Sequence, residues 1–197
     1  MPSELILTQD GTNPPAPAAN EVTLFAKAGS MYAIGNAGTV KELSFVNDLV
    51  MLEYNVASGV NGGSAAAAVW ETRPINTVDV NPNGICTLNT STNQFVLLSG
   101  TYEYQIVTTQ HQINRVRIRL FNVTDSVAIK TSVTAHLTTG VGTPITLMGY
   151  FTIGAAKSLS IQQYSQTALA ALGMGIAGNA PGVNEIFLQA MFRRISL

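Results

Sequence analysis

Apolar and polar residues alternate along three stretches in the second half of the chain. These are residues 95–104 (FVLLSGTYEY), 115–125 (RVRIRLFNVTD) and 147–153 (LMGYFTI), each bounded by Gly, Asn, Asp or Ser. Alternation with a period of two is typical of β-strands that bury one face and expose the other. From residue 69 onward the pattern predicts strands without an intervening helix, and therefore an all-β sandwich. The last strand is predicted at residues 185–195.

The first third of the chain has a different pattern. Prolines in residues 13–17 (NPPAP) fix φ and remove hydrogen-bond donors, which predicts an extended arm. Residues 20–43 predict two or three short strands, a β-meander too small to be stable without a partner. Residues 44–56 fit either a strand or a short helix. The Gly- and Ala-rich residues 58–68 predict a flexible linker.

These patterns divide the chain into three parts. We expect an N-terminal arm with a small β-module for attachment at residues 1–57, the linker at 58–68, and the sandwich domain at 69–197. A length of 197 residues suits one domain of ordinary size with an appendage. The first part is expected to attach to another protein through the apolar residues of its arm and strands. These are Leu5, Ile6, Leu7, Leu24, Phe25, Met31 and Tyr32.

The charge of the chain is small in both net value and total amount. With 10 basic and 11 acidic residues, no basic field favours nucleic acid or anionic lipid. Charged residues make up 11% of the chain, against about 25% in typical proteins. Two interpretations fit: a strand-rich surface of Ser, Thr, Asn and Gln, or a surface buried against copies or partners. We favour the second.

No segment predicts membrane insertion or export. Residues 1–10 lack the basic start and long apolar core of a signal peptide. The most apolar stretch, residues 168–177, is shorter than the roughly 20 residues that span a bilayer, and its Gly and Ala residues suggest a packed loop.

Residues that could carry chemistry are few and scattered. His111 and His136 lie apart and without a group of carboxylates, and Cys86 is the single cysteine, expected to be a small buried hydrophobe. We therefore predict no catalytic residue, no metal site, no cofactor and no enzymatic activity. Arg115, Arg117 and Arg119 alternate, so their guanidinium groups share one face. That face is either solvated or a contact with another subunit or another protein.

Six short sequence motifs between residues 70 and 197 occur in the order found in one family. They are residues 72–77 (TRPINT), Phe95 with Gly100 and Tyr102, residues 119–125 (RLFNVTD), Leu147 with Gly149 and Phe151, residues 159–163 (LSIQQ), and residues 185–192 (EIFLQAMF). Together they resemble the jelly-roll domain of the C1q and tumour-necrosis-factor group, in the form found in bacteriophage fibre and capsid decoration proteins. Residues 24–43 also resemble an N-terminal element of phage fibre and head-fibre proteins.

The resemblance implies a homotrimer. It places Tyr102, Tyr104 and Ile106 in the jelly-roll interior and the opposite face of the same strand against the threefold axis. The trimer interface residues expected on this basis, together with the arginines, are Glu103, Gln105, Val107, Arg115 and Arg117.

The resemblance also implies a function. We expect a virion structural protein on the outer surface of a phage particle, made in the host cytoplasm, that docks on the major capsid protein or another virion protein. It would cement or decorate the capsid, with the jelly roll pointing outward. The alternative is a tail-fibre or receptor-binding tip that binds a host surface glycan. Trp70, the single tryptophan, precedes the strands of the domain and weakens that alternative.

Overall fold

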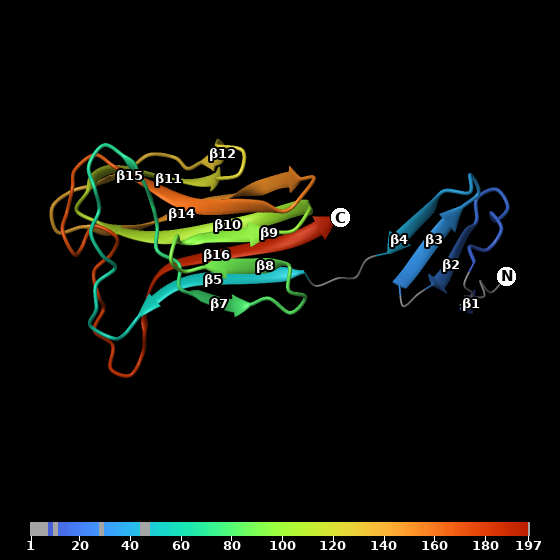
Figure 1. Ribbon diagram of the computed structural model, residues 1–197, viewed down its shortest axis with the longest axis horizontal. Coiled ribbons are helices and arrows are strands. Elements are labelled where there is room, and N and C mark those ends of the chain that lie inside the picture. Colours follow the sequence, from blue (N-terminus) through green and yellow to red (C-terminus); the bar gives the residue numbers. More distant parts are fainter. Residues whose placement is uncertain (1–7, 10–11, 28–29, 44–47, 197) are drawn as a thin grey trace. The chain divides into compact units, whose positions relative to one another are not determined.

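The computed structural model describes residues 8–9, 12–27, 30–43 and 48–196. The chain forms two compact units, Met1–Val46 and Asn47–Leu197, and the described residues form strands and no helix (Figure 1). No helix within these ranges is long and apolar enough to cross a membrane.

The first unit is one small sheet. Its strands are β1 (Thr8–Gln9), β2 (Val22–Lys27), β3 (Ser30–Gly35) and β4 (Val40–Leu43), paired in that order. The predicted meander of short strands is confirmed by β2, β3 and β4, which are antiparallel, whereas β1 runs parallel to β2. Phe25 and Ile34 are buried, and the Phe25 ring stacks on Tyr32 at 5.3 Å between centroids.

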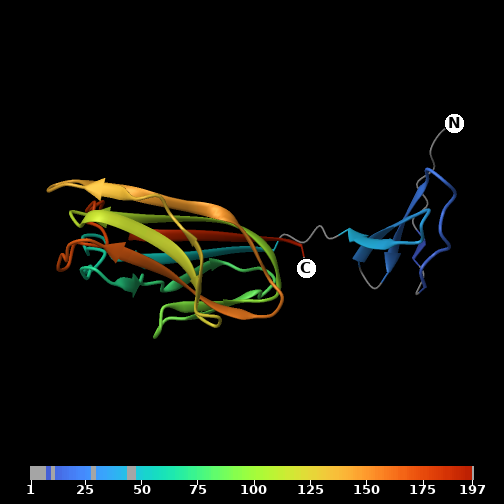
Figure 2. The same ribbon diagram turned by 90° about the horizontal axis from the view of Figure 1, so that it is seen from above.

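The second unit is a sandwich of two sheets, as predicted (Figures 1 and 2). The first sheet, called here the β10 sheet, has the order β14 (Gly142–Ile153), β10 (Gly100–His111), β16 (Glu185–Ser196), β5 (Leu49–Val56), β7 (Thr77–Val80). The second, called here the β11 sheet, has the order β12 (Val127–Thr131), β11 (Asn114–Asn122), β15 (Lys157–Ser165), β9 (Gln94–Leu97), β8 (Cys86–Asn89). Two short strands extend the β11 sheet: β13 (Ala135–Leu137) pairs with β11, and β6 (Trp70–Thr72) pairs with β15. This all-β arrangement is the jelly-roll sandwich that the pattern and the resemblance predicted.

The two units divide earlier than the sequence suggested. Residues 49–56, which fitted a strand or a helix, form β5 in the middle of the β10 sheet between β16 and β7. The division lies between Val46 and Asn47, so the first part ends at residue 46 rather than at the expected residue 57.

Residues 58–68 do not form a linker. They pack against the loop that precedes β16: Ala65 pairs with Leu169, and the Gly62 amide donates to the Gly175 carbonyl at 2.9 Å. A Cβ on Gly62 would lie 2.6 Å from the Met174 carbonyl oxygen, so only glycine permits this approach of two backbones. Small residues here serve close packing rather than flexibility, and residues 168–177 are the packed loop that was predicted.

The core between the sheets is rich in aromatic side chains. Tyr102 and Tyr104 are buried as predicted, and each ring lies within 6 Å of Phe151, at 5.5 and 5.7 Å between centroids. Phe192 packs on Phe95 of the opposite sheet at 5.1 Å. Cys86 is also buried, which confirms its predicted role, and burial raises the pKa of its thiol to about 12.

The chain enters and leaves the sandwich at one end. Leu49, at the start of β5, pairs with Arg193 near the end of β16. The Arg194 Nε donates to the buried Asp48 carboxylate at 2.5 Å and closes this end. Residues 57–69 and 166–184, which contact each other, therefore lie at the opposite end, between β5 and β6 and between β15 and β16.

Candidate interaction surfaces

The five residues predicted for the trimer interface lie on two different surfaces. Glu103, Gln105 and Val107 point outward from β10, because the alternate residues Tyr102, Tyr104 and Ile106 are buried. Arg115 and Arg117 point outward from β11 in the other sheet. The structure therefore separates a set that the sequence had grouped together. Which of these residues contacts a second subunit stays a prediction.

The outer surface of the β10 sheet, called here the β10 face, carries exposed apolar side chains. Tyr150 lies beside Glu103 and is 80% exposed, and Met148 lies beside Gln105 and is 62% exposed. Met191 flanks Gln105 on the other side. These neighbours come from β14 and β16, so sequence analysis of β10 alone missed them.

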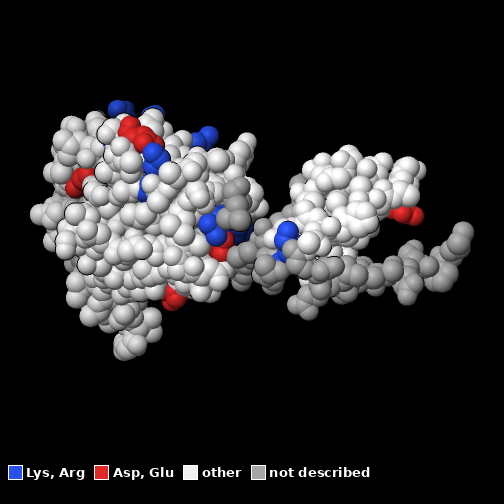
Figure 3. All heavy atoms as spheres, turned by 45° about the vertical axis from the view of Figure 1, so that its right-hand side comes forward, with Lys and Arg blue, Asp and Glu red and all other residues white. Residues whose placement is uncertain are grey.

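One ion pair crosses the same face. The Arg193 guanidinium binds the Glu103 carboxylate, with Nε donating to Oε2 at 3.2 Å, and both side chains are about half exposed. Elsewhere charge is sparse: on the side seen in Figure 3, charged side chains form small groups on an otherwise uncharged surface. The β10 face thus combines exposed apolar side chains with amide and hydroxyl groups, the Glu103–Arg193 pair, and the Glu53 carboxylate, which accepts a hydrogen bond from Gln189 Nε2 at 2.8 Å.

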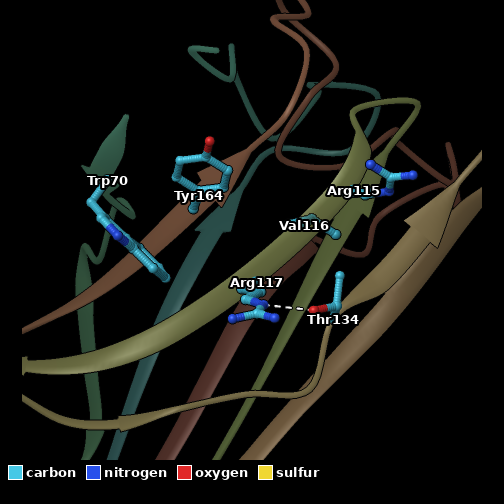
Figure 4. A pocket seen from close by; sticks show the side chains of 6 residues that line it. All are labelled: Trp70, Arg115, Val116, Arg117, Thr134 and Tyr164. Carbon is cyan, nitrogen blue, oxygen red and sulfur yellow. Dashed lines mark hydrogen bonds between the residues drawn. The ribbon is translucent and has the colours of Figure 1, made fainter. Parts of the chain in front are cut away.

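The outer surface of the β11 sheet has a groove between aromatic and basic side chains. Strand register places Trp70, Tyr164 and Arg117 in one row across β6, β15 and β11. This arginine groove has a volume of about 390 Å³ and is lined by Trp70, Arg115, Val116, Arg117, Thr134 and Tyr164. Figure 4 shows the two aromatic rings on one side and the two arginines on the other.

Several contacts hold the side chains of the groove in place. The Trp70 and Tyr164 rings lie 5.6 Å apart, and Arg117 Nε donates to Thr134 Oγ1 at 2.6 Å. Behind them, the Arg119 guanidinium lies 4.2 Å from the Trp70 ring centroid and 4.4 Å from that of Phe121. Partial burial lowers the pKa of Arg119. The alternating arginines thus share one face as predicted, but Trp70 and Tyr164 join them only through strand pairing.

A fully buried arginine lies inside the sandwich. Arg73 donates from Nη1 to Gln163 Oε1 at 2.7 Å and to the Thr109 carbonyl at 3.1 Å, and from Nη2 to the carbonyls of Phe187 at 2.9 Å and Met174 at 3.1 Å. Burial lowers its pKa to about 10. Arg73 connects both sheets and the loop before β16. The sequence segment 72–77, in which it lies, did not reveal this structural role.

The residues considered for chemistry do not converge. His111 is buried at the end of β10, and His136 is exposed on β13. Over the described ranges, no three His, Cys, Asp or Glu side chains are placed to hold a metal ion. Glu71 has a pKa raised by burial, and its carboxylate accepts a hydrogen bond from the Ala66 amide at 3.0 Å, which fits a structural role.

The predicted attachment residues fall partly outside the described part of the chain. Leu5, Ile6 and Leu7 lie outside the described residues. Phe25 is buried in the first unit, and Leu24, Met31 and Tyr32 are half-buried. Their contact with another protein stays a prediction.

Comparison with known proteins gives structural neighbours and no relatives in sequence. No family model and no curated protein matches the chain. Its fold is similar to the globular domain of a zebrafish complement 1qA protein, with 12% identity and a TM-score of 0.49 over 76% of this chain and 98% of that one. It is similar to murine APRIL with 7% identity and a TM-score of 0.49, over 75% and 99%. At these values no function is carried over.

Proposed function

We propose that the protein is a homotrimeric structural protein of a phage virion. Its N-terminal unit would attach to the major capsid protein or another virion protein, and its jelly roll would be displayed on the outer surface of the particle. The observation that carries the homotrimer is the exposure of Tyr150 and Met148 on the β10 face, and the phage virion rests on the resemblance of residues 24–43 and 70–197. A protein of this kind would be made in the host cytoplasm and incorporated into the particle.

The β10 face has the chemistry and the size of a protein interface. Exposed Tyr150 and Met148 would gain free energy by leaving water, at about 25 cal/mol per Å² of apolar surface. Five strands about 4.8 Å apart, and about 3.3 Å per residue along them, give a surface of roughly 700 Å². That is close to the roughly 800 Å² per partner of a stable interface. Tyr and Met are also enriched in interface cores.

The N-terminal unit supports attachment because its sheet has little core of its own. Its buried hydrophobic residues, among those described, are Phe25 and Ile34. A single sheet with so small a core is stabilised when a second layer covers it. The chain enters the jelly roll at the end opposite to residues 57–69 and 166–184.

A receptor-binding tip is the second candidate, and the arginine groove favours it. The sequence offered Trp70 as a single tryptophan at the entry of the domain. The structure places it beside Tyr164 and two arginines, which is a surface suited to a polar ligand. Both candidates share the displayed trimer and differ in what the N-terminal unit attaches to.

To test this, purified protein is added to phage particles that lack it, and the particles are imaged by electron microscopy. The mass of the free protein is measured separately by light scattering. A mass near three times 20.8 kDa and density over the capsid would support decoration. Density at the tail alone would transfer the function to the receptor-binding candidate. A monomer that binds neither site would overturn the proposal.

A matched pair of variants tests the attachment site. Leu24→Ser removes a half-buried apolar side chain from β2, and Thr23→Ser changes its neighbour by one methyl group. Leu24→Ser should abolish binding to particles while the trimer mass is kept, and Thr23→Ser should bind normally. Equal binding by both variants would contradict attachment through this strand.

A further inference from the structure

We propose that the arginine groove binds a carbohydrate that carries a carboxylate group, such as a sialic or uronic acid unit of a surface glycan. The proposal deepens the receptor-binding candidate and rests on the outward display of the jelly roll. The groove lies on the β11 sheet, so self-association through the β10 face would leave it open.

The aromatic side of the groove suits a sugar ring. Trp70 and Tyr164 are half-buried and inclined at 53° to each other, which presents a bent apolar wall. Sugar rings have apolar C–H faces that pack against such rings, and the indole N–H and phenol O–H can bond to hydroxyl groups. The volume of about 390 Å³ lies within the roughly 300–1,000 Å³ of small-ligand sites.

The basic side of the groove selects an anion. Arg115 and Arg117 are exposed, none of the six lining residues is acidic, and neither arginine forms a salt bridge within the described part of the chain. A guanidinium group presents parallel N–H donors that match the two oxygens of a carboxylate. Charge complementarity therefore favours an acidic sugar over a neutral one.

The groove is held in shape before any ligand arrives. Thr134 fixes the Nε of Arg117, which leaves its Nη groups to bind a ligand. Arg119 covers the Trp70 ring and is itself held by Gln162 Oε1 at 2.8 Å. Such preorganisation lowers the entropy lost on binding.

A nucleic acid fits the same surface less well. Binding along a phosphate backbone requires an extended basic track, whereas the net charge of the chain is −1 and the arginines of β11 occupy only three alternate positions of that strand. A carboxylated sugar needs only one guanidinium group, to bind the carboxylate, and one aromatic surface, to pack against the sugar ring.

The test uses Trp70 fluorescence, because this residue is the single tryptophan of the chain. The full-length protein is titrated with 3′-sialyllactose, a glucuronic acid oligosaccharide, neutral lactose and an oligothymidylate. At least one carboxylated sugar should change the emission and bind at least tenfold more tightly than lactose. Tighter binding of the oligothymidylate, or no response to either acidic sugar, would overturn the proposal. That outcome would leave the proposed function undecided, because the trimer mass and the binding to particles are measured in separate experiments.

Variants locate the site. Arg117→Met should weaken binding of the acidic sugar at least tenfold, and Arg117→Lys, which keeps the charge without the fork, should weaken it about threefold to tenfold. Lys130→Met removes an exposed positive charge from β12 outside the groove and should bind like the parent. Trp70→Phe should bind more tightly than Trp70→Ala when binding is followed by calorimetry. Equal losses in Arg117→Met and Lys130→Met would show only a general charge effect and would overturn the assignment.

Discussion

The two outer faces of the jelly roll carry opposite chemistry on the same scaffold. The β10 face exposes Tyr150 and Met148 and pairs its Glu103 with Arg193. The β11 sheet exposes Arg115 and Arg117 beside Trp70. Both faces follow from the same alternation in sequence, with most of the inward residues apolar in each. The difference lies only in the outward residues, which are free to specify what each face binds.

The comparison indicates how one sandwich can serve assembly and recognition together. An apolar face binds through buried area, which suits a permanent contact between copies. A face with forked donors and an aromatic wall binds through directional contacts, which suits a small polar ligand. Because the core separates the two faces, substitutions on one should leave the other intact.

The largest effect is expected from removing the arginine that joins the two sheets. In Arg73→Met, the Gln163 Oε1 atom and the Thr109 carbonyl lose the arginine donor, and the Met174 and Phe187 carbonyls keep only the Thr109 hydroxyl, which they share. Each buried unpaired acceptor costs about 1–3 kcal/mol, and relief from burying a charge offsets part of the sum. We expect the free energy of unfolding to fall by about 3–5 kcal/mol in urea denaturation.

The control for this loss is an arginine on the outer surface. Arg115→Met should change the free energy of unfolding by less than about 0.5 kcal/mol, since Arg115 is exposed. Equal stability of the two variants would mean that Arg73 does not join the sheets.

The next effect separates the two faces. Tyr150→Glu places a carboxylate at the most exposed apolar position of the β10 face, where a trimer would bury it unpaired. Self-association should weaken at least about a hundredfold, equivalent to about 2.7 kcal/mol, and the scattering mass should fall toward 20.8 kDa.

The matched control is Val127→Glu on β12, which is 52% exposed on the other sheet and should keep the parent mass. If the scattering mass fell only in Val127→Glu, the contact between subunits would lie on the β11 sheet, which would contradict the prediction.

Sequence patterns predicted those parts of the fold that depend on one strand at a time. Alternation placed Tyr102 and Tyr104 on one face of a strand, and the resemblance assigned that face to the interior, where both side chains are buried. Features made by two segments were not. Gly62 belongs to a stretch whose composition is the same for a flexible linker and for a tightly packed loop, and only the second backbone decides between them.

The candidate sites show the same limit more sharply. The arginine stripe on β11 was predictable from its period, but Trp70 lies 47 positions before Arg117 and reaches it only through the register of β6 and β15. The apolar character of the β10 face likewise arises from β14 and β16 beside β10. Because strand pairing is set by the whole sheet, a single strand with alternating residues does not specify its neighbours.

The smallest effect is expected at the loops, away from both faces, and depends on pH. The Glu185 carboxylate accepts hydrogen bonds from the amides of Gly178, Gly59 and Asn179, and these lower its pKa below the ordinary 4.5. A lowered pKa in the folded state means that the stabilisation is present above pH 4.5 and is lost as the pH falls through the lowered value. Glu185→Gln should therefore lower the unfolding temperature slightly at pH 7 and match the parent at low pH. It should also raise amide exchange at residues 59 and 178–179 while Tyr150 and Trp70 keep their environments, because the two faces rest on the core rather than on these loops. A difference between parent and variant that grows as the pH falls would have the wrong sign for this carboxylate.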